Sequence, residues 1–290
     1  MHGTTPWFDQ WDPNPPESPV VLSVQHAGRD YPPEMADQLR VPIAQLRPLE
    51  DRYVDALALA ARRHETLFVQ RAARAWIDLN RGERERDPKL DDGADARRTS
   101  IESHRLRSGL GLVPRRIASA GDIWRHRLRS ADVDARIAAC HRPYHGAIAK
   151  ALNAARDRFG IAILLDIHSM PPLGTEGPVA RIVFGDRFGR SAAARFVSRM
   201  ESIAEAAGLR HALNTPYAGG HLLDRHGQPS ANIHAIQIEW CRSLYLDAAL
   251  DQPGEGLPMA ARALRGMIDA VADEALNGAA PFAPHALAAE

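Results

Sequence analysis

Residues 74–81, with the sequence Arg-Ala-Trp-Ile-Asp-Leu-Asn-Arg, combine a short apolar run with side chains that bind anions. Tryptophan, isoleucine and leucine favour extended backbone, so we interpret the span from Arg74 to Leu79 as a buried strand. Just after it, Arg81 offers a planar guanidinium that can pair with both oxygens of a carboxylate, and Asn80 adds a neutral donor. An isolated motif of this kind is more simply a strand end with a solvated arginine, but two histidine motifs elsewhere favour carboxylate recognition.

These two motifs each place a histidine directly after an apolar strand: Ser-Val-Gln-His-Ala-Gly around His26 and Leu-Asp-Ile-His-Ser around His168. A hydrolytic zinc site uses three neutral or anionic protein ligands and keeps a fourth position open for water. The two histidines would supply two of these ligands. The third would come from a carboxylate after the first loop, where Glu50 and Asp51 are adjacent candidates. A single histidine is usually an ordinary polar residue, so the interpretation depends on these groups occurring together.

Alternating periodicity predicts the elements that position these groups. The run 161–167 is almost continuously apolar, as in a central strand covered on both faces. Further strands are expected at 20–24, 66–70, 180–184 and 233–239, and helices at 51–64, 132–159 (interrupted near Pro143), 190–207 and 257–276.

This alternation of strands and helices predicts a largely parallel sheet in three layers. In such sheets ligands bind beyond the carboxyl ends of the strands. Five polar residues fall at or just past such ends, namely His26, Asn80, Arg81, His168 and Glu239. Their shared position predicts a single site.

Residues 1–18 are rich in proline, aspartate and tryptophan and are expected to form an irregular arm, followed by one catalytic domain over 19–290. Within it, residues 81–130 read as a surface excursion with one or two short helices. This excursion holds twelve arginines and one lysine against eight acidic residues, which would suit RNA or DNA. Trp124 is its only aromatic residue, so base stacking is unsupported and a solvated lid is favoured.

The overall composition excludes several classes of protein. The 36 basic and 36 acidic residues balance, so no global field favours nucleic acid or a membrane as partner. Cys140 and Cys241 are too few for a disulfide framework or a cysteine metal site. Neither a secretory signal nor a run of about 18 apolar residues is present, so we expect a cytoplasmic protein with no membrane partner. The oligomeric state is left open.

His141 and His145 have the i, i+4 spacing of helical zinc sites, but no glutamate follows His141 and Pro143 interrupts the helix. We therefore expect a structural or substrate-side role for His145 and none for His141. Ser169 lacks the Gly-x-Ser-x-Gly elbow of a serine nucleophile.

Seven motifs follow one another along the chain from about residue 19 to 250: 24–28 (Val-Gln-His-Ala-Gly), 49–55 (Leu-Glu-Asp-Arg-Tyr-Val-Asp), 77–81 (Ile-Asp-Leu-Asn-Arg), 143–145 (Pro-Tyr-His), 166–169 (Asp-Ile-His-Ser), 219–220 (Gly-Gly) and 237–239 (Gln-Ile-Glu). In this order they resemble the N-formylglutamate amidohydrolase family, which is related to aspartoacylase and the zinc carboxypeptidases. Gln25 stands where this family usually has proline, and Arg52-Tyr53 where Trp-His often occurs.

The resemblance implies a three-layer α/β/α sandwich with a mixed, mainly parallel sheet, and one zinc ion or other divalent metal per chain. It implies hydrolysis of a small anionic N-acyl amino acid, above all N-formyl-L-glutamate to formate and glutamate, the closing step of one route of histidine breakdown. Alternatives are a zinc deacylase for another small N-acyl acid and a non-catalytic anion or nucleic-acid binder. The implied residues are His26, Asp51 and His168 as zinc ligands, with Glu50 competing for the middle position, Glu239 as general base, Arg74 near the oxyanion, and Asn80, Arg81 and His145 as substrate-binding groups; Asp166 has no assigned role.

Overall fold

Two long parallel strands, β6 (Ala162–Met170) and β9 (Ile233–Cys241), form the centre of the computed structural model, and every residue in both is buried. This burial explains why apolar residues make up most of both strands, because helices cover both faces of the sheet. The structure describes residues 7–94, 104–174 and 179–278. Parts of the predicted arm, excursion and catalytic domain, at 1–6, 95–103, 175–178 and 279–290, lie outside the described residues.

Within the described part of the chain the main sheet has seven strands in the order β1-β3-β2-β6-β9-β7-β8. The four neighbours β3, β2, β6 and β9 run parallel, and β7 and β8 are parallel to each other. Antiparallel pairing joins β1 to β3 and β7 to β9, so the predicted mixed, mainly parallel sheet is confirmed. The remaining strands are β1 (Phe8–Trp11), β2 (Val20–Val24), β3 (Thr66–Gln70), β7 (Ile182–Gly185) and β8 (His211–Leu213).

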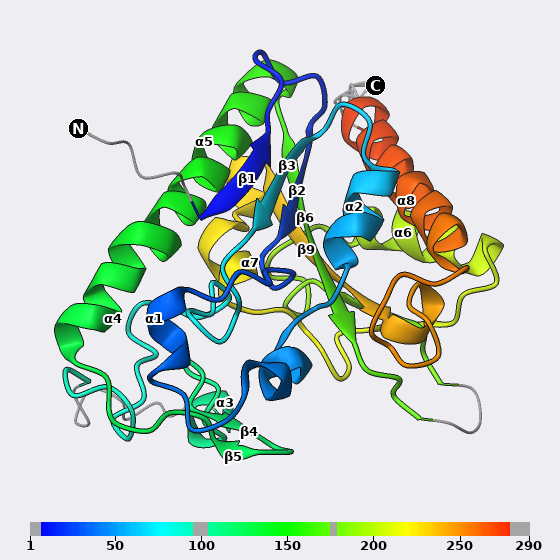
Figure 1. Cartoon of the computed structure of the whole chain (residues 1–290). Coiled ribbons are helices and arrows are strands. Elements are labelled where there is room, and N and C mark those ends of the chain that lie inside the picture. The colour runs from blue at the N-terminus through cyan, green and yellow to red at the C-terminus, as the bar shows by residue number, and fades with distance from the viewer. Residues whose placement is uncertain (1–6, 95–103, 175–178, 279–290) are drawn as a thin grey trace, which may run out of the picture.

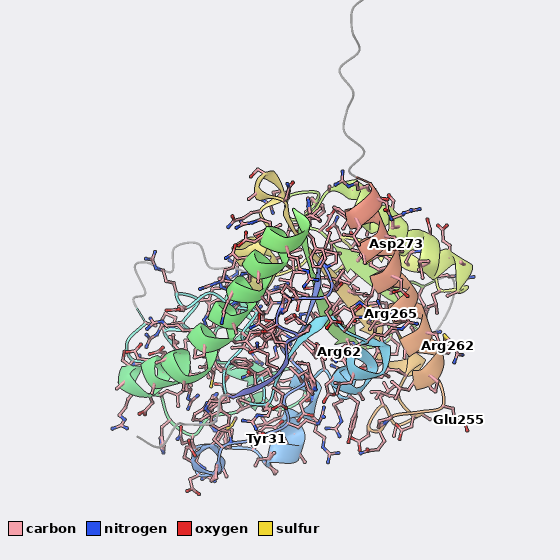
Figure 2. All side chains as sticks on the ribbon, turned by 90° about the horizontal axis from the view of Figure 1, so that it is seen from above. Tyr31, Arg62, Glu255, Arg262, Arg265 and Asp273 are labelled. Atoms are coloured by element: carbon pink, nitrogen blue, oxygen red, sulfur yellow. The ribbon has the colours of Figure 1, made fainter. Side chains whose placement is uncertain are left out.

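Helices cover the two faces of this sheet, as Figure 1 shows. On one face, α2 (Val54–Ala61), α6 (Ala194–Ala206) and α8 (Leu257–Asn277) pack on alternate residues of the central strands. Arg265 of α8 ties this layer together (Figure 2), because it donates to the Ala61 carbonyl at 3.1 Å and pairs with Glu65 at 2.8 Å. On the other face lie α4 (Ser130–Arg136), α5 (Arg142–Phe159) and α7 (His221–His226).

Smaller elements lie mostly around the carboxyl edge of the sheet. In its described residues, 81–94 and 104–130, the excursion contains one short helix and a two-stranded ribbon, in line with the expectation of little regular structure. These elements are α1 (Pro33–Ala36), α3 (His104–Arg107), β4 (Arg116–Ile117), β5 (Gly121–Asp122) and the 3₁₀ turns Ile43–Leu49, Pro229–Ala231 and Arg242–Leu244. In the described ranges no helix has the length and apolarity to cross a membrane.

The prediction of a strand at 74–79 is wrong. The prediction of an irregular arm is wrong for residues 8–11, which form a strand. The arm supplies β1, which occupies the sheet position beside β3. Residues 74–79 instead turn past the edge of the sheet, where the Trp76 N–H donates to the Ala73 carbonyl and the Asp78 N–H to the Leu112 carbonyl. The apolar side chains of this segment are buried against the excursion and α5. Burial therefore gives the segment the composition of a strand, although it pairs with no described strand of the sheet.

The predicted interruption near Pro143 takes the form of a π-helical turn, Ile137–His141, that joins α4 to α5 without a break. Proline lacks an N–H and its ring clashes with the carbonyl one turn earlier, so a wider turn before it accommodates the ring. His141 is therefore held at the junction of the two helices. The helix expected at 51–64 begins only at Val54, which leaves Asp51 in irregular backbone.

Candidate active site

A cavity of about 230 Å³ opens at the carboxyl ends of β2, β6 and β9. As the strand-end argument predicted, it gathers residues from distant parts of the chain. Of the predicted site residues, His26, Asp51, Arg74, Asn80, Arg81, His168 and Glu239 line it, and Arg105, Tyr217, Gln237 and Arg242 join them without having been predicted.

His26, Asp51 and His168, here called the His–Asp cluster, each offer a ligand atom, and these atoms lie within 4.8 Å of one another. Oδ2 of Asp51 lies 2.9 Å from Nδ1 of His168 and 3.7 Å from Nδ1 of His26. The Asp51 N–H donates to the His26 carbonyl at 2.9 Å, which fixes the aspartate beside the first histidine. Both Nδ1 atoms therefore face one carboxylate.

A second carboxylate holds the far side of each histidine ring. Nε2 of His26 lies 2.7 Å from Asp78 and Nε2 of His168 lies 2.9 Å from Asp166. Because an ionised carboxylate only accepts, Nε2 of His26 carries the hydrogen and its Nδ1 presents a lone pair. His168 lies between two carboxylates and donates from both nitrogens, and its Nδ1 proton is the one that a bound metal would replace. Metal-ligating histidines typically have this support. The donor set of two imidazoles and a carboxylate therefore fits Zn²⁺. Asp166, whose role the sequence left open, orients His168.

The charge balance of the cluster also favours a cation. Burial lowers the pKa of His26 to about 4. Burial likewise disfavours a charged His168, but the neighbouring carboxylates Asp166 and Asp51 outweigh it and raise the pKa of His168 well above its ordinary value. The pKa of Asp51 is lowered despite burial, mainly through its hydrogen bond with His168. A positive charge between Asp51 and Asp166 is therefore stabilised.

Glu239 lies opposite His168 in the pairing of β6 with β9. Burial raises the pKa of Glu239 to about 7, further raised by Asp51 and Asp166 and opposed by His168 and Arg74. The amide of Gln237 donates to it at 3.0 Å. A carboxyl group with a near-neutral pKa can both accept and release a proton at physiological pH.

Four arginines line the cavity and make its wall cationic, and three of them, Arg74, Arg81 and Arg105, differ in how many of their donors are engaged. Arg74 donates through Nε to Asp78 at 2.9 Å. Arg81 is almost fully buried and donates to the carbonyls of Leu110 at 2.8 Å and of Asn80 at 2.6 Å. Two of its three guanidinium nitrogens are therefore already engaged in hydrogen bonds within the protein. Among the residues that the structure describes, the guanidinium of Arg105 has no hydrogen-bond partner. It is the arginine most available to a ligand.

Asn80 has a structural task as well, because its Oδ1 accepts the N–H of Leu222 in the first turn of α7 at 3.0 Å. Gly220, just before α7, must be glycine, since a Cβ there would lie 2.4 Å from the same oxygen. Arg242 donates to Asp51 at 3.3 Å and to the Glu50 carbonyl at 2.6 Å, and these hydrogen bonds hold the Asp51 carboxylate in place.

The structure separates the two acids that the sequence left as alternatives. Asp51 lies in the cavity, whereas Glu50 points away and accepts hydrogen bonds from Tyr31 and Arg52. Of the two acids, Asp51 is therefore the one placed where it could share a metal with His26 and His168.

His145 does not line the cavity, so the prediction of a substrate-binding His145 does not hold in this structure. Its Nδ1 lies 3.0 Å from His226 and its Nε2 lies 2.9 Å from the Leu79 carbonyl. The ring is fully buried behind the segment that carries Asn80 and Arg81. Sequence spacing could not show on which side of that segment the ring lies.

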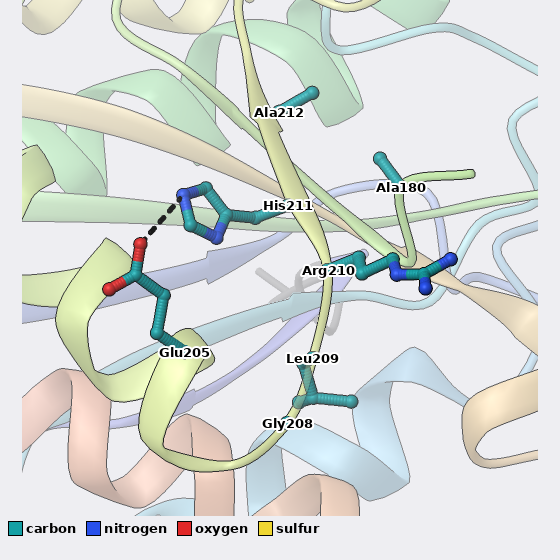
Figure 3. Close-up of a pocket in the computed structure, with 7 residues that line it drawn as sticks. All are labelled: Ala180, Glu205, Gly208, Leu209, Arg210, His211 and Ala212. Carbon is teal, nitrogen blue, oxygen red and sulfur yellow. Dashed lines mark ion pairs between the residues drawn. The ribbon is translucent and has the colours of Figure 1, made fainter. Parts of the chain in front are cut away.

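A second, more open pocket beside β8 has a different character (Figure 3). It is lined by short side chains together with Glu205, Arg210 and His211, and Nε2 of His211 lies 4.0 Å from Glu205. In the part of the chain described here, no group of three metal ligands faces this pocket. The cavity at the sheet edge is therefore the candidate active site.

A mixed α/β sheet whose carboxyl edge presents carboxylate-supported histidines beside a buried glutamate has the architecture of a hydrolase. Residues 18–246 match the N-formylglutamate amidohydrolase family, and the chain belongs to that family. It is therefore an amidohydrolase.

Individual relatives agree with this membership. The chain is 30% identical to an N-formylglutamate deformylase of Pseudomonas putida over 79% of this chain and 82% of the relative. A crystal structure of N-formylglutamate amidohydrolase from Ralstonia eutropha superposes with a TM-score of 0.84 at 30% identity, covering 93% of this chain and 99% of that one. A gene product of Agrobacterium tumefaciens shares the fold, with a TM-score of 0.63 at 22% identity over 92% of this chain and 94% of that one.

Proposed function

We propose that this protein hydrolyses the amide bond of N-formyl-L-glutamate to formate and L-glutamate, with one zinc ion held by His26, Asp51 and His168. The observation that carries the proposal is the His–Asp cluster, whose histidines are both supported by carboxylates, beside Glu239 in a small cavity. The relatives named N-formylglutamate deformylase support the choice of substrate. The reaction would close one route of histidine breakdown.

When bound, zinc would acidify water and polarise the formyl carbonyl. Glu239 takes up the proton that the attacking water loses and delivers it to the departing nitrogen of glutamate. Its buried position suits both transfers, because a pKa near 7 leaves neither the acid nor the base form strongly favoured. Arg74 donates to the oxygen on which negative charge develops. Asp78 and Asp166 keep the two histidine rings in the orientation that the ligands need.

The substrate carboxylates are bound by the cationic wall of the cavity. Arg105 provides a guanidinium that has no hydrogen-bond partner among the described residues, and Arg81 and Asn80 contribute those N–H donors that their existing hydrogen bonds do not use. A cavity of about 230 Å³ is smaller than the sites that enclose drug-sized ligands, which favours a formyl or other short acyl group over a long chain.

A substrate panel tests this proposal. We would incubate zinc-loaded protein with N-formyl-L-glutamate, N-acetyl-L-glutamate, N-formyl-L-glutamine and N-formyl-L-leucine and measure the released amine. The highest kcat/KM is expected for N-formyl-L-glutamate. Loss of the side-chain carboxylate in the glutamine and leucine compounds should raise KM, and the acetyl compound should lose turnover. A preference for the acetyl or the leucine compound would contradict the proposed substrate, and no release from any compound would contradict the proposed reaction.

A further inference from the structure

Four histidines meet on the other side of the segment that carries Asn80 and Arg81. They are called the four-histidine cluster and comprise His141 at the end of the π-helical turn, His145 in α5, and His221 and His226 at the two ends of α7. A ring nitrogen from each of His141, His145 and His221 lies within 4.8 Å of one from each of the others. The cluster lies outside the lining of the active-site cavity except through its shared backbone segment.

Backbone carbonyls fix two of these rings. Nε2 of His141 donates to the Arg81 carbonyl at 2.8 Å, and Nε2 of His145 donates to the Leu79 carbonyl at 2.9 Å. A carbonyl can only accept, so in both rings Nδ1 carries the lone pair. These lone pairs belong to neutral imidazoles, the form that coordinates metals.

Two ring nitrogens in the cluster are buried and make no hydrogen bond among the described residues. Nδ1 of the fully buried His141 and Nε2 of His221 have no hydrogen-bond partner in the described structure. Leaving a buried polar atom unpaired costs roughly 1–3 kcal/mol, so such atoms usually have a partner that the protein chain does not supply. Two of them beside a third lone pair point to a bound cation.

We propose that His141, His145 and His221 form a second zinc site, distinct from the His–Asp cluster. Three imidazoles suit Zn²⁺ and other late first-row divalent metals, whereas Mg²⁺ and Ca²⁺ require oxygen ligands. Oε1 of Glu83 lies 3.8 Å from Nδ1 of His141 and can complete the site, or a water can.

The site would require a small movement of the rings. Ligands around a tetrahedral zinc lie about 3.3 Å apart, so nitrogens that lie within 4.8 Å of one another must approach by up to about 1.5 Å. His145 would also exchange its hydrogen bond with His226 for the metal. Two positive charges nearby, Arg142 and Arg225, are on exposed side chains that solvent screens, and Arg142 is paired with Glu83.

The position of the site implies a structural role. It joins the π-helical turn and α5 to the start of α7, and its histidines hold the carbonyls of Leu79 and Arg81. The segment between those carbonyls carries Asn80, whose amide in turn caps the first turn of α7. A metal here would fix the wall of the active-site cavity from behind without touching the substrate.

Zinc stoichiometry tests the proposal independently of catalysis. In a His26→Ala/His168→Ala background, which empties the His–Asp cluster, the protein should retain about one zinc per chain after dialysis. Adding His141→Gln and His221→Gln should remove it. A matched control that adds His64→Gln and His126→Gln, two exposed histidines outside both clusters, should keep it. A background without zinc, or with zinc that survives the His141 and His221 changes, overturns the second site while leaving the proposed function intact.

A titration of the otherwise unsubstituted protein guards against misfolded variants. Metal-free protein titrated with Co²⁺ should bind two equivalents and develop the absorption of two nitrogen-ligated sites. The His221→Gln variant, changed at a partly exposed helix start, should lose only the second equivalent. Saturation of the unsubstituted protein at one equivalent, with no second absorption change, would overturn the proposal.

Discussion

The His–Asp cluster and the four-histidine cluster place similar numbers of ligand atoms at similar spacing, yet their surroundings differ. In the first, carboxylates hold the outer nitrogens of His26 and His168, and a third carboxylate lies between the rings. In the second, backbone carbonyls hold His141 and His145. Carboxylates increase the basicity of a ligating imidazole and offset the charge of the metal, whereas carbonyls mainly orient the ring.

The clusters also differ in what they face. The His–Asp cluster opens onto the cavity that contains Glu239 and the arginines, whereas the four-histidine cluster is enclosed by helices. Histidine spacing therefore identifies a possible metal site, but the charge and the open space around that site decide what it can do. The first arrangement suits chemistry and the second suits structural support.

The largest effect is expected for His168→Ala. Two remaining ligands cannot hold zinc tightly against water, so the variant should lose one zinc equivalent and its turnover should fall by roughly 10⁴-fold or more. His26→Ala should behave alike. His221→Gln, the matching change in the four-histidine cluster, should cost far less turnover. Metal analysis and steady-state kinetics on the same samples measure this, and full zinc occupancy in His168→Ala would remove His168 from the ligand set.

Glu239→Gln should lower kcat by about 10²–10⁴-fold while zinc and fold are retained, because the amide keeps the volume but cannot carry a proton. The pH profile adds a second readout. A base works when deprotonated, so a raised pKa means that activity of the unsubstituted protein is lost as pH falls through that pKa, and bound zinc would move this limb below pH 7. Near-normal turnover in the variant would show that another group activates the water.

Arg105→Ala should raise KM for N-formyl-L-glutamate by about ten- to hundred-fold with little change in kcat, since a charged hydrogen bond to a carboxylate contributes about 1.5–3 kcal/mol. Arg81→Ala should raise KM as well, and Arg81→Lys should recover little because ammonium lacks the fork. Arg84, an exposed arginine of the same excursion, provides the control Arg84→Ala. Equal kinetics for all four variants would mean that other groups bind the substrate carboxylates.

The supporting carboxylates give the test that most sharpens the comparison. Asp166→Asn keeps the shape of the side chain but removes its charge, so zinc affinity of the His–Asp cluster should fall by about 10–100-fold. The side-chain hydrogen bonds of Asp166 are made to Ser23, Gln25 and His168, so the zinc affinity of the four-histidine cluster should be unaffected. Competition with a chromogenic chelator measures both affinities. An unchanged affinity in Asp166→Asn would show that the carboxylate only orients His168, as the carbonyls do for His141 and His145.

Much of this organisation could be predicted from the sequence, for identifiable physical reasons. The strands 20–24 and 66–70 were predicted with their observed bounds, because a β-branched run between turn residues is a local property. The expectation that ligands bind beyond the carboxyl ends of the strands correctly predicted that His26, His168 and Glu239 line one cavity.

The local sequence pattern could not show which segments pack against one another in the folded chain. The apolar run at 74–79 has the composition of a strand, but the sheet position beside β3 is occupied by β1. Asp78 supports His26, although nothing in the sequence distinguishes it from the buried acids of an ordinary turn. His221 joins His141 only because α7 packs beside α5, and Arg105 reaches the cavity from an excursion without periodicity.

The measurement that tests the central claim most directly is reconstitution of the metal-free protein. Protein stripped by a chelator should release no glutamate from N-formyl-L-glutamate, and adding Zn²⁺ until both clusters can be filled should restore activity in the unsubstituted protein but not in His168→Ala. The restored rate should track occupancy of the His–Asp cluster. Full activity in the stripped protein, or equal restoration in His168→Ala, would contradict the account.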